Sequence, residues 1–377
     1  MKATMSALFK KFLQEATRLT RNGSLQEATR AIQQALGRTA PLATPPHAAS
    51  PWNANSEAID VVARPVHRAA HQPVSEPVRP IFTPAQPASN DGPGAFTEAA
   101  FTHAGTTRSY KIYAPPHATT HSTPAAQPLV LMLHGCTQNP DDFASGTGMN
   151  ALALEHGFVV LYPAQNQKAN AQRCWNWFIP GDQQRDTGEA AWLAALVQHV
   201  TQLRPIDPAR IYVAGLSAGA AMASILGHTH PDVFAAVGVH SGLACGVASN
   251  VITALSVMKN GRSTAGAPSR LPTIVFHGDA DKTVHLLNAD VVLQTAIGKA
   301  TTTAKVTEGS ARKGQRYTRT TYQTADGSNV AENWTLHGAG HAWSGGSPKG
   351  SYTDPLGPDA SAEMWRFFEA HPRKPVH

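Results

Sequence analysis

A serine between two glycines is the strongest chemical signal in the chain. The segment GLSAG, centred on Ser217, follows the apolar run 211–214 and precedes small residues typical of a helix. A sharp strand-to-helix turn lifts a serine hydroxyl above a sheet, and it needs glycine on both sides because a side chain there would collide with backbone. The helix N-terminus adds partial positive charge where an oxyanion develops. The pattern therefore predicts that Ser217 is a nucleophile for acyl transfer.

A serine hydroxyl is a poor nucleophile at neutral pH, so it needs a basic side chain and a carboxylate that orients the base. The acid candidates lie in IVFHGDADKTV, residues 274–284. Asp281 is favoured because it lies deeper in the loop and Val284 can pin the segment that follows to the core. Asp279, directly after the glycine turn, is the alternative and is better placed to bond local backbone.

The base candidates lie in HGAGHAW, residues 337–343. His337 closes an expected strand, which is typical of a structural histidine. His341 is carried past Gly-Ala-Gly on a loop that can reach across the strand ends, so it is the favoured base. His134 and His277 each precede a glycine and are interpreted as turn or wall residues.

Acyl transfer also needs backbone donors for the oxyanion of the tetrahedral intermediate. One is expected to be the amide of Ala218, directly after the nucleophile. The other is expected from the loop HGCTQ, residues 134–138, through the amide of Cys136. Losing one such donor typically costs about 2.7–4 kcal/mol of transition-state stabilisation. This chemistry requires no metal or organic cofactor.

Short apolar runs alternate with helical patterns from residue 95 onwards, which predicts an α/β fold with a mostly parallel sheet covered on both faces. Each expected site residue follows one of the runs, and sites in such sheets lie at the carboxyl ends of the strands. The expected strands are 108–114, 129–134, 158–163, 211–216, 235–240, 273–277 and 333–337. The expected helices are 149–156, 188–203, 218–228, 286–299 and 359–370.

The composition excludes several other classes of protein. Of the formal net charge of +6, residues 1–93 carry +4, so the remainder is nearly balanced and a nucleic-acid partner is not expected. The chain has no P-loop, dinucleotide fingerprint or zinc-type spacing. Its three cysteines do not make a disulfide scaffold. No apolar run approaches the roughly 18 residues of a transmembrane segment.

The first part of the chain has a different character. Residues 1–38 are expected to form a helical hairpin, either a docking or oligomerisation element or an amphipathic basic face for a hydrophobic surface. Residues 39–94 are rich in Pro, Ala and Ser and are interpreted as a linker, and 95–377 as the catalytic domain. The N-terminus lacks the features of a secretory signal, which does not support export.

Six segments together resemble the PHB depolymerase family of esterases, the short-chain-length polyhydroxyalkanoate depolymerases with a type 1 catalytic domain. They are LMLHGCTQNPDDFA, CWNWF, RIYVAGLSAGAAM, HSGLACG, VFHGDADKTV and GHAWSGGSPKGSYTDPLGPDASAEMWRFF. The resemblance implies an α/β-hydrolase fold, hydrolysis of poly(3-hydroxybutyrate) or a related polyester, an extracellular location, and the triad Ser217, Asp281 and His341. The cytoplasm is the alternative location.

Two rival functions stay open. One is a feruloyl or acetylxylan esterase acting on plant biomass, and the other is a non-catalytic hydrolase-fold binding protein. Around the expected site, Trp175, Trp177 and Trp343 are candidates for an aromatic substrate rim, with ordinary core packing as the alternative. Cys174 and Cys245 both follow expected strands, so a disulfide between them would clamp this rim; two buried free thiols are the alternative.

Overall fold

The computed structural model describes residues 94–116, 125–261, 269 and 271–373 of the chain. The expected hairpin and all but the last residue of the expected linker lie outside the described residues, so both stay predictions. The first described strand, β1, begins at Ala95. That is the residue at which the sequence predicts the catalytic domain to begin.

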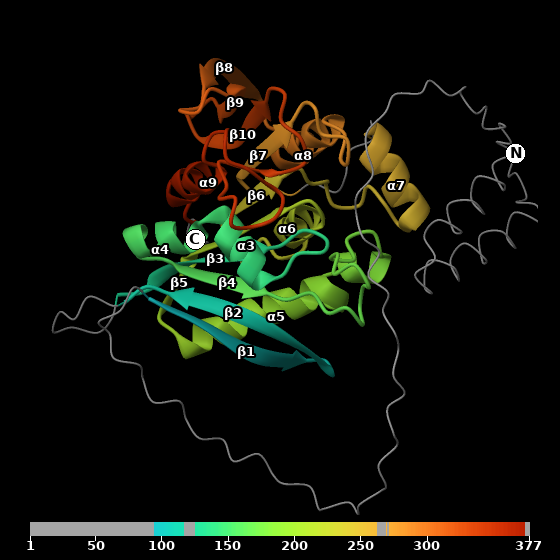
Figure 1. Cartoon of the computed structure of the whole chain (residues 1–377), viewed down its shortest axis with the longest axis vertical. Coiled ribbons are helices and arrows are strands. Elements are labelled where there is room, and N and C mark those ends of the chain that lie inside the picture. Colours follow the sequence, from blue (N-terminus) through green and yellow to red (C-terminus); the bar gives the residue numbers. More distant parts are fainter. Residues whose placement is uncertain (1–93, 117–124, 262–268, 270, 374–377) are drawn as a thin grey trace, which may run out of the picture. The chain divides into compact units, whose positions relative to one another are not determined.

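A ten-stranded sheet forms the centre of the described structure (Figure 1). Its order is β1-β2-β4-β3-β5-β6-β7-β10-β9-β8. The strands from β4 to β10 in this order run parallel to one another. Antiparallel pairs flank them at both edges. The bounds are β1 Ala95–His103, β2 Thr106–Ala114, β3 Gln127–Leu133, β4 Val159–Pro163, β5 Ile206–Leu216, β6 Ala236–His240, β7 Thr273–Gly278, β8 Thr302–Ser310, β9 Arg316–Thr324 and β10 Asn329–Leu336.

Seven α-helices lie in the described ranges, together with a 3-10 turn at Pro180–Gln183 and a small sheet of β11 (Trp343–Ser344) and β12 (Thr353–Asp354). None of the described helices is long and apolar enough to cross a membrane. Their bounds are α3 Pro140–Thr147, α4 Met149–His156, α5 Gly188–Leu203, α6 Ala218–Thr229, α7 Val251–Asn260, α8 Leu287–Ile297 and α9 Ala360–Glu369.

Side-chain alternation along β3 explains why helices cover both faces of the sheet. Leu129, Leu131 and Leu133 face a core shared with α5, α6 and α8. Val130 and Met132 face a second core shared with α3, α4 and α9. All five side chains are fully buried, as expected for a central strand of a parallel sheet.

The seven expected strands and five expected helices are all present, with ends shifted by a few residues. Strands β1, β8 and β9 were not predicted, because most side chains of β1 and β8 are exposed and those of β9 are mostly half-buried, so no apolar alternation marks them. Helix α3, which has only eight residues, and helix α7, in which only Ala254 and Val257 are buried, were not predicted either.

Parallel pairing brings the carboxyl ends of β3, β5, β6, β7 and β10 to one edge of the sheet. The connections that leave this edge carry Cys136, Ser217, Asp281 and His341. Residues that are far apart in the sequence therefore meet along one line of loops, as the sequence pattern predicts.

Candidate active site

Ser217 lies in a strained turn between β5 and α6. Its φ and ψ are 57° and −118°, a conformation that non-glycine residues rarely adopt. A Cβ on Gly215 would lie 2.5 Å from the carbonyl carbon of Gly219, and one on Gly219 would lie 2.0 Å from the carbonyl oxygen of Leu133. Both glycines are thus required by close backbone approach, and the turn has the geometry expected of a nucleophile elbow.

The loop after β3 lies directly beside this elbow. A Cβ on Gly135 would lie 3.7 Å from the Cβ of Ser217, so the backbone leading to Cys136 passes close to the nucleophile. The Gly135 amide donates to the Gln138 side chain at 2.9 Å, which holds the turn closed. Ala218 is the first residue of α6, and the first amides of a helix have no partner within it. The two segments that carry the expected oxyanion donors, the start of α6 and the loop after β3, therefore both lie next to Ser217.

Asp281 and His341 form a hydrogen-bonded pair, with 2.7 Å between His341 Nδ1 and Asp281 Oδ2. The other carboxylate oxygen accepts the amides of Thr283 and Val284 at 2.8 and 2.9 Å. Val284 is fully buried and so anchors the loop as the sequence predicts. These contacts hold the carboxylate in one orientation toward the imidazole.

The charge of Asp281 is stabilised despite its burial. Burial alone would raise its pKa, but the hydrogen bond and electrostatic interaction with His341, together with the Val284 and Thr283 amides, outweigh that and hold the pKa below its ordinary value. His277 lies 3.6 Å from the same carboxylate and donates from Nε2 to the Val284 carbonyl at 2.8 Å. Burial lowers the pKa of His277, so it is a neutral wall residue.

The alternative candidates pair with each other. His337 donates from Nδ1 to Asp279 at 2.9 Å, and the Gly338 amide donates to the other oxygen of Asp279 at 2.7 Å. The second ring nitrogen of His337 is bound to the hydroxyl of Thr318 at 2.8 Å. Asp279 was expected to bond local backbone, but its partners lie in the loop after β10. His337 uses both ring nitrogens, as expected for a structural histidine.

His240 also lies at the site, although it was not predicted from the sequence. Its carbonyl accepts the Ser217 amide at 2.9 Å, and its Nε2 accepts the Ser344 amide at 3.0 Å. Burial lowers the pKa of His240 to about 3, so the ring stays neutral and can act as an acceptor. It thereby ties the nucleophile turn to the loop that carries His341. Its position at the end of an expected strand, in HSGLACG, was the available signal.

The expected Cys174–Cys245 disulfide is wrong. Cys136 and Cys174 form the bond, and Cys245 is a free, buried thiol whose pKa burial raises to about 12. The strand order gives the reason: Cys136 follows β3 and Cys174 follows the neighbouring β4, whereas Cys245 follows β6 on the far side of β5. The disulfide therefore fastens the expected oxyanion loop to its neighbour.

The expected aromatic rim is also wrong. Trp175, Trp177 and Trp343 are only 0%, 5% and 1% exposed and belong to the two cores. The indole of Trp175 donates to the His134 carbonyl at 3.1 Å, and that of Trp343 donates to Ser361 at 3.1 Å. These side chains therefore pack in the cores beneath the loops that carry the site residues, as in the core-packing alternative.

The chain is similar in sequence to several esterases. The family model described as "Esterase PHB depolymerase" matches residues 108–315. The chain is 32% identical over 237 residues to poly(3-hydroxyalkanoate) depolymerase C of Paucimonas lemoignei, covering 58% of this chain and 55% of that protein. It is 29% identical over 150 residues to feruloyl esterase B of Thermothelomyces thermophilus, covering 40% of this chain and 49% of that protein. The chain thus spans about half the length of these curated relatives.

Among solved structures, an acetyl xylan esterase from Aspergillus awamori matches 73% of this chain and 99% of its own. The TM-score is 0.55 at 18% sequence identity, which supports the fold. The expected α/β-hydrolase fold is confirmed by this likeness and by the mostly parallel sheet with helices on both faces. Since the family model covers more than half of the chain, this protein belongs to the esterase PHB depolymerase family, a family of carboxylic ester hydrolases.

Proposed function

We propose that this protein is a serine esterase that cleaves its substrate through an acyl intermediate on Ser217. The observation that carries the proposal is the strained turn of Ser217, which lies on the same sheet edge as the hydrogen-bonded pair of Asp281 and His341. Backbone strain of this kind persists only where the surrounding structure enforces it, and it is typical of functional sites.

In the proposed acylation step, the Ser217 oxygen attacks the ester carbonyl while Nε2 of His341 takes the hydroxyl proton. Asp281 holds the ring with its proton on Nδ1, which leaves Nε2 as the acceptor. The amides of Ala218 and Cys136 would stabilise the oxyanion. His341 then returns the proton to the leaving alcohol, and water resolves the acyl-serine by the same route.

The contact between Ser217 and His341 is part of this proposal. In the described residues, His341 is hydrogen-bonded only to Asp281. The proposal requires the ring and the serine hydroxyl to come within hydrogen-bond reach in the substrate complex, because catalytic hydrogen bonds often tighten only there.

A fluorophosphonate probe tests this chemistry directly. It should label the wild-type protein at Ser217, and Ser217→Ala should abolish both labelling and turnover while the melting temperature changes little. Ser224→Ala is the matched control, because Ser224 lies in α6, the helix that follows Ser217, and its hydroxyl donates to the Ala220 carbonyl. This variant should keep labelling. An unlabelled, inactive wild-type protein would favour the non-catalytic binding protein instead.

We propose that the substrate is poly(3-hydroxybutyrate) or a related short-chain polyhydroxyalkanoate. Depolymerases acting on such polymers are among the relatives, at 32% identity for the Paucimonas protein and 37% over 135 residues for that of Ralstonia pickettii. A feruloyl or acetylxylan ester is the second candidate, favoured by relatives with those names. Turbidity loss of emulsified poly(3-hydroxybutyrate), compared with release of ferulate from methyl ferulate, separates the two.

We also propose that the protein works outside the cytoplasm. The disulfide between Cys136 and Cys174 supports an oxidising compartment, because cytosolic thiols are normally kept reduced. Thiol titration of protein taken from its native source tests this. One thiol per denatured, unreduced chain supports the proposal, and three contradict it.

A further inference from the structure

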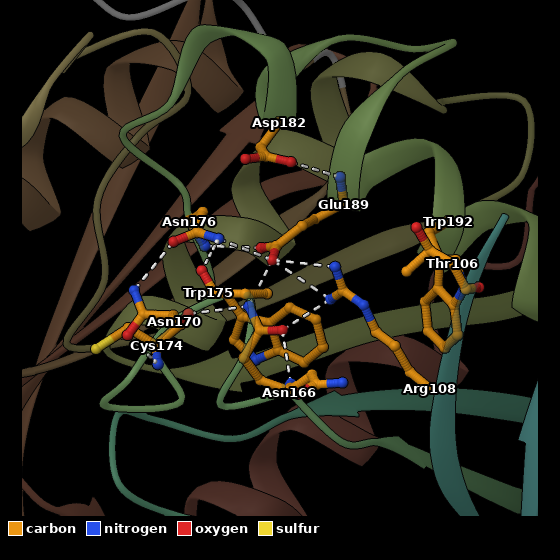
Figure 2. A network of polar contacts seen from close by, with 12 residues as sticks. Thr106, Arg108, Asn166, Asn170, Cys174, Trp175, Asn176, Asp182, Glu189 and Trp192 are labelled. Carbon is orange, nitrogen blue, oxygen red and sulfur yellow. Dashed lines mark hydrogen bonds and ion pairs between the residues drawn. The ribbon is translucent and has the colours of Figure 1, made fainter. Parts of the chain in front are cut away.

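A buried carboxylate, that of Glu189, lies at the centre of a network of polar contacts (Figure 2). Glu189, at the start of α5, is 1% exposed. Its Oε1 accepts from both terminal nitrogens of Arg108 at 3.3 Å, from Gln165 at 2.5 Å and from the side chain of Asn176 at 3.1 Å. Its Oε2 accepts the Asn176 amide at 2.7 Å. Five donors from three residues, which lie on β2 and in the connection after β4, therefore converge on one side chain.

The charges of this network are balanced inside the protein. Burial raises the pKa of Glu189, while the positive charge of Arg108 and the donors Gln165 and Asn176 oppose that shift. The Arg108 guanidinium lies over the rings of Trp175 and Trp192, at 5.9 and 5.3 Å from their centroids. The Glu189 carboxylate is therefore the counter-charge of a buried cation, and its removal would leave that cation unpaired.

The segment held by Glu189 is the one that supports the oxyanion loop. Gln165 also donates to the Cys174 carbonyl at 2.9 Å, and its backbone amide donates to the ring of His134 at 3.2 Å. Cys174 is bonded to Cys136, and the Thr137 amide donates to the Gln172 carbonyl at 2.6 Å. Loop residues His134, Cys136 and Thr137 are thus each attached to the segment that Glu189 organises.

We propose that Glu189 is a positioning residue for the oxyanion hole, acting through Gln165 and the Cys136–Cys174 disulfide to set the place of the Cys136 amide. The inference rests on the proposed esterase function and extends it to a carboxylate that touches no substrate. Oxyanion donors must lie within hydrogen-bond distance of an atom that carries charge only transiently, and a displacement of about 1 Å can cost on the order of 100-fold in rate.

Glu189→Gln is the direct test. The glutamine keeps the shape but loses the charge, and its amide group must face a donor from Arg108, Gln165 or Asn176. We expect kcat on p-nitrophenyl butyrate to fall by about 10- to 100-fold, with KM within about threefold. The affinity for a trifluoromethyl ketone should fall by a similar factor, because its adduct places an oxyanion in the same hole. Glu155→Gln, on the exposed face of α4, is the control and should match the wild type.

If the role of Glu189 is purely structural, Glu189→Gln should lower the melting temperature but leave kcat and ketone affinity unchanged at assay temperatures well below it. That result would overturn the proposal. Gln165→Ala is the second variant, because it removes the link to Cys174 and leaves the carboxylate in place. If Glu189→Gln does not fold, Gln165→Ala decides: a loss in kcat and ketone affinity supports the proposal, and wild-type values overturn it.

Amide hydrogen exchange in residues 134–138 separates a failure of this inference from a failure of the esterase function, because it needs no turnover. Faster exchange in this loop in Gln165→Ala or Glu189→Gln, with unchanged exchange in the loop after β7, supports the positioning role. Unchanged exchange in residues 134–138 overturns it, whether or not the wild-type protein hydrolyses esters.

Discussion

Asp281 pairs with His341 and Asp279 pairs with His337, so the loops after β7 and β10 are joined twice by the same kinds of side chain. The distances between paired atoms are similar, 2.7 and 2.9 Å. In the first pair the Asp281 side chain is fully buried and that of His341 is 13% exposed, whereas the side chains of Asp279 and His337 are 35% and 37% exposed. The same kind of aspartate–histidine pair is thus buried in one case and exposed to solvent in the other. We call Asp281–His341 the enclosed pair and Asp279–His337 the open pair.

The pairs also differ at the second ring nitrogen. In His337 it is bound to the Thr318 hydroxyl, so both nitrogens are occupied. In His341, within the described part of the chain, only Nδ1 makes a hydrogen bond. A general base needs one nitrogen held and the other available for a proton, and only His341 meets that condition. An aspartate–histidine contact alone therefore does not identify the catalytic pair.

Replacement of each histidine should separate the pairs most strongly. His341→Ala should lower kcat on p-nitrophenyl butyrate by about 10⁶-fold, because it removes the proposed base. His337→Ala should stay within about threefold, since that ring is committed to structure. Steady-state kinetics on variants of matched melting temperature checks this. Similar losses in both variants would break the distinction between the pairs.

The aspartates should differ next, through the tautomer of the ring that each one holds. In Asp281→Asn the amides of Thr283 and Val284 still need an oxygen, so the asparagine NH₂ faces His341. The ring then carries its proton on Nε2 and cannot accept another from Ser217, and kcat should fall by about 10⁴-fold.

In Asp279→Asn the same tautomer change is harmless, because the partner of the second nitrogen in His337 is a hydroxyl that can accept as well as donate. We expect kcat within about threefold of the wild type. Nitrogen chemical shifts of the two rings would report the tautomers. A 10⁴-fold loss of kcat in Asp279→Asn would show that Asp279, and not Asp281, is the acid of the triad.

The preference for Asp281 could be derived from the sequence because it depends on a few consecutive residues. A strand, a glycine turn and a buried Val284 within the same short segment determine which carboxylate is drawn inward. The order of elements around Ser217 could be predicted for a similar reason, since strand, turn and helix follow one another directly.

Contacts between distant segments could not be derived in this way. The pairing of Cys136 with Cys174 depends on the order of β3, β4, β5 and β6 in the sheet, which hydrophobic periodicity does not reveal. Whether Trp175 lines a surface or a core depends on what packs over it. The same limit applies to Glu189, whose donors Arg108 and Asn176 come from separate parts of the chain.

Acid should weaken the surroundings of the enclosed pair in particular. Burial lowers the pKa of the neighbouring His240 from 6.5 to about 3, so between these values the unfolded chain binds a proton that the folded chain does not. The stabilisation is therefore complete above pH 6.5 and is lost as pH falls toward 3, at up to roughly 1.4 kcal/mol per pH unit. The free energy of unfolding, measured with urea between pH 7 and 4.5, should fall less steeply with decreasing pH in His240→Gln than in the wild type. The control His103→Gln, at an exposed position, should keep the wild-type pH dependence.

Salt should produce the smallest difference between the pairs. Burial would raise the pKa of Asp279, but the His337 hydrogen bond and the Gly338 amide hold it below its ordinary value, so the folded state favours the charged carboxylate. Because this pair is open to water, Asp279→Asn should lower the free energy of unfolding by only about 0.2–1 kcal/mol. Asparagine can keep the Gly338 hydrogen bond, so the remaining loss is mainly electrostatic.

That loss should shrink in about 1 M NaCl, where the Debye length is about 3 Å. The cost of Asp281→Asn should change little with salt, because its carboxylate is fully buried and ions cannot approach it. Urea unfolding of both variants at pH 7, in about 0.05 M and about 1 M NaCl, gives the two salt dependences. The contrary result would be a loss of unfolding free energy in Asp279→Asn that equals the loss in Asp281→Asn and does not change with salt. The open pair would then be as well shielded from ions as the enclosed pair, and burial would not be what separates them.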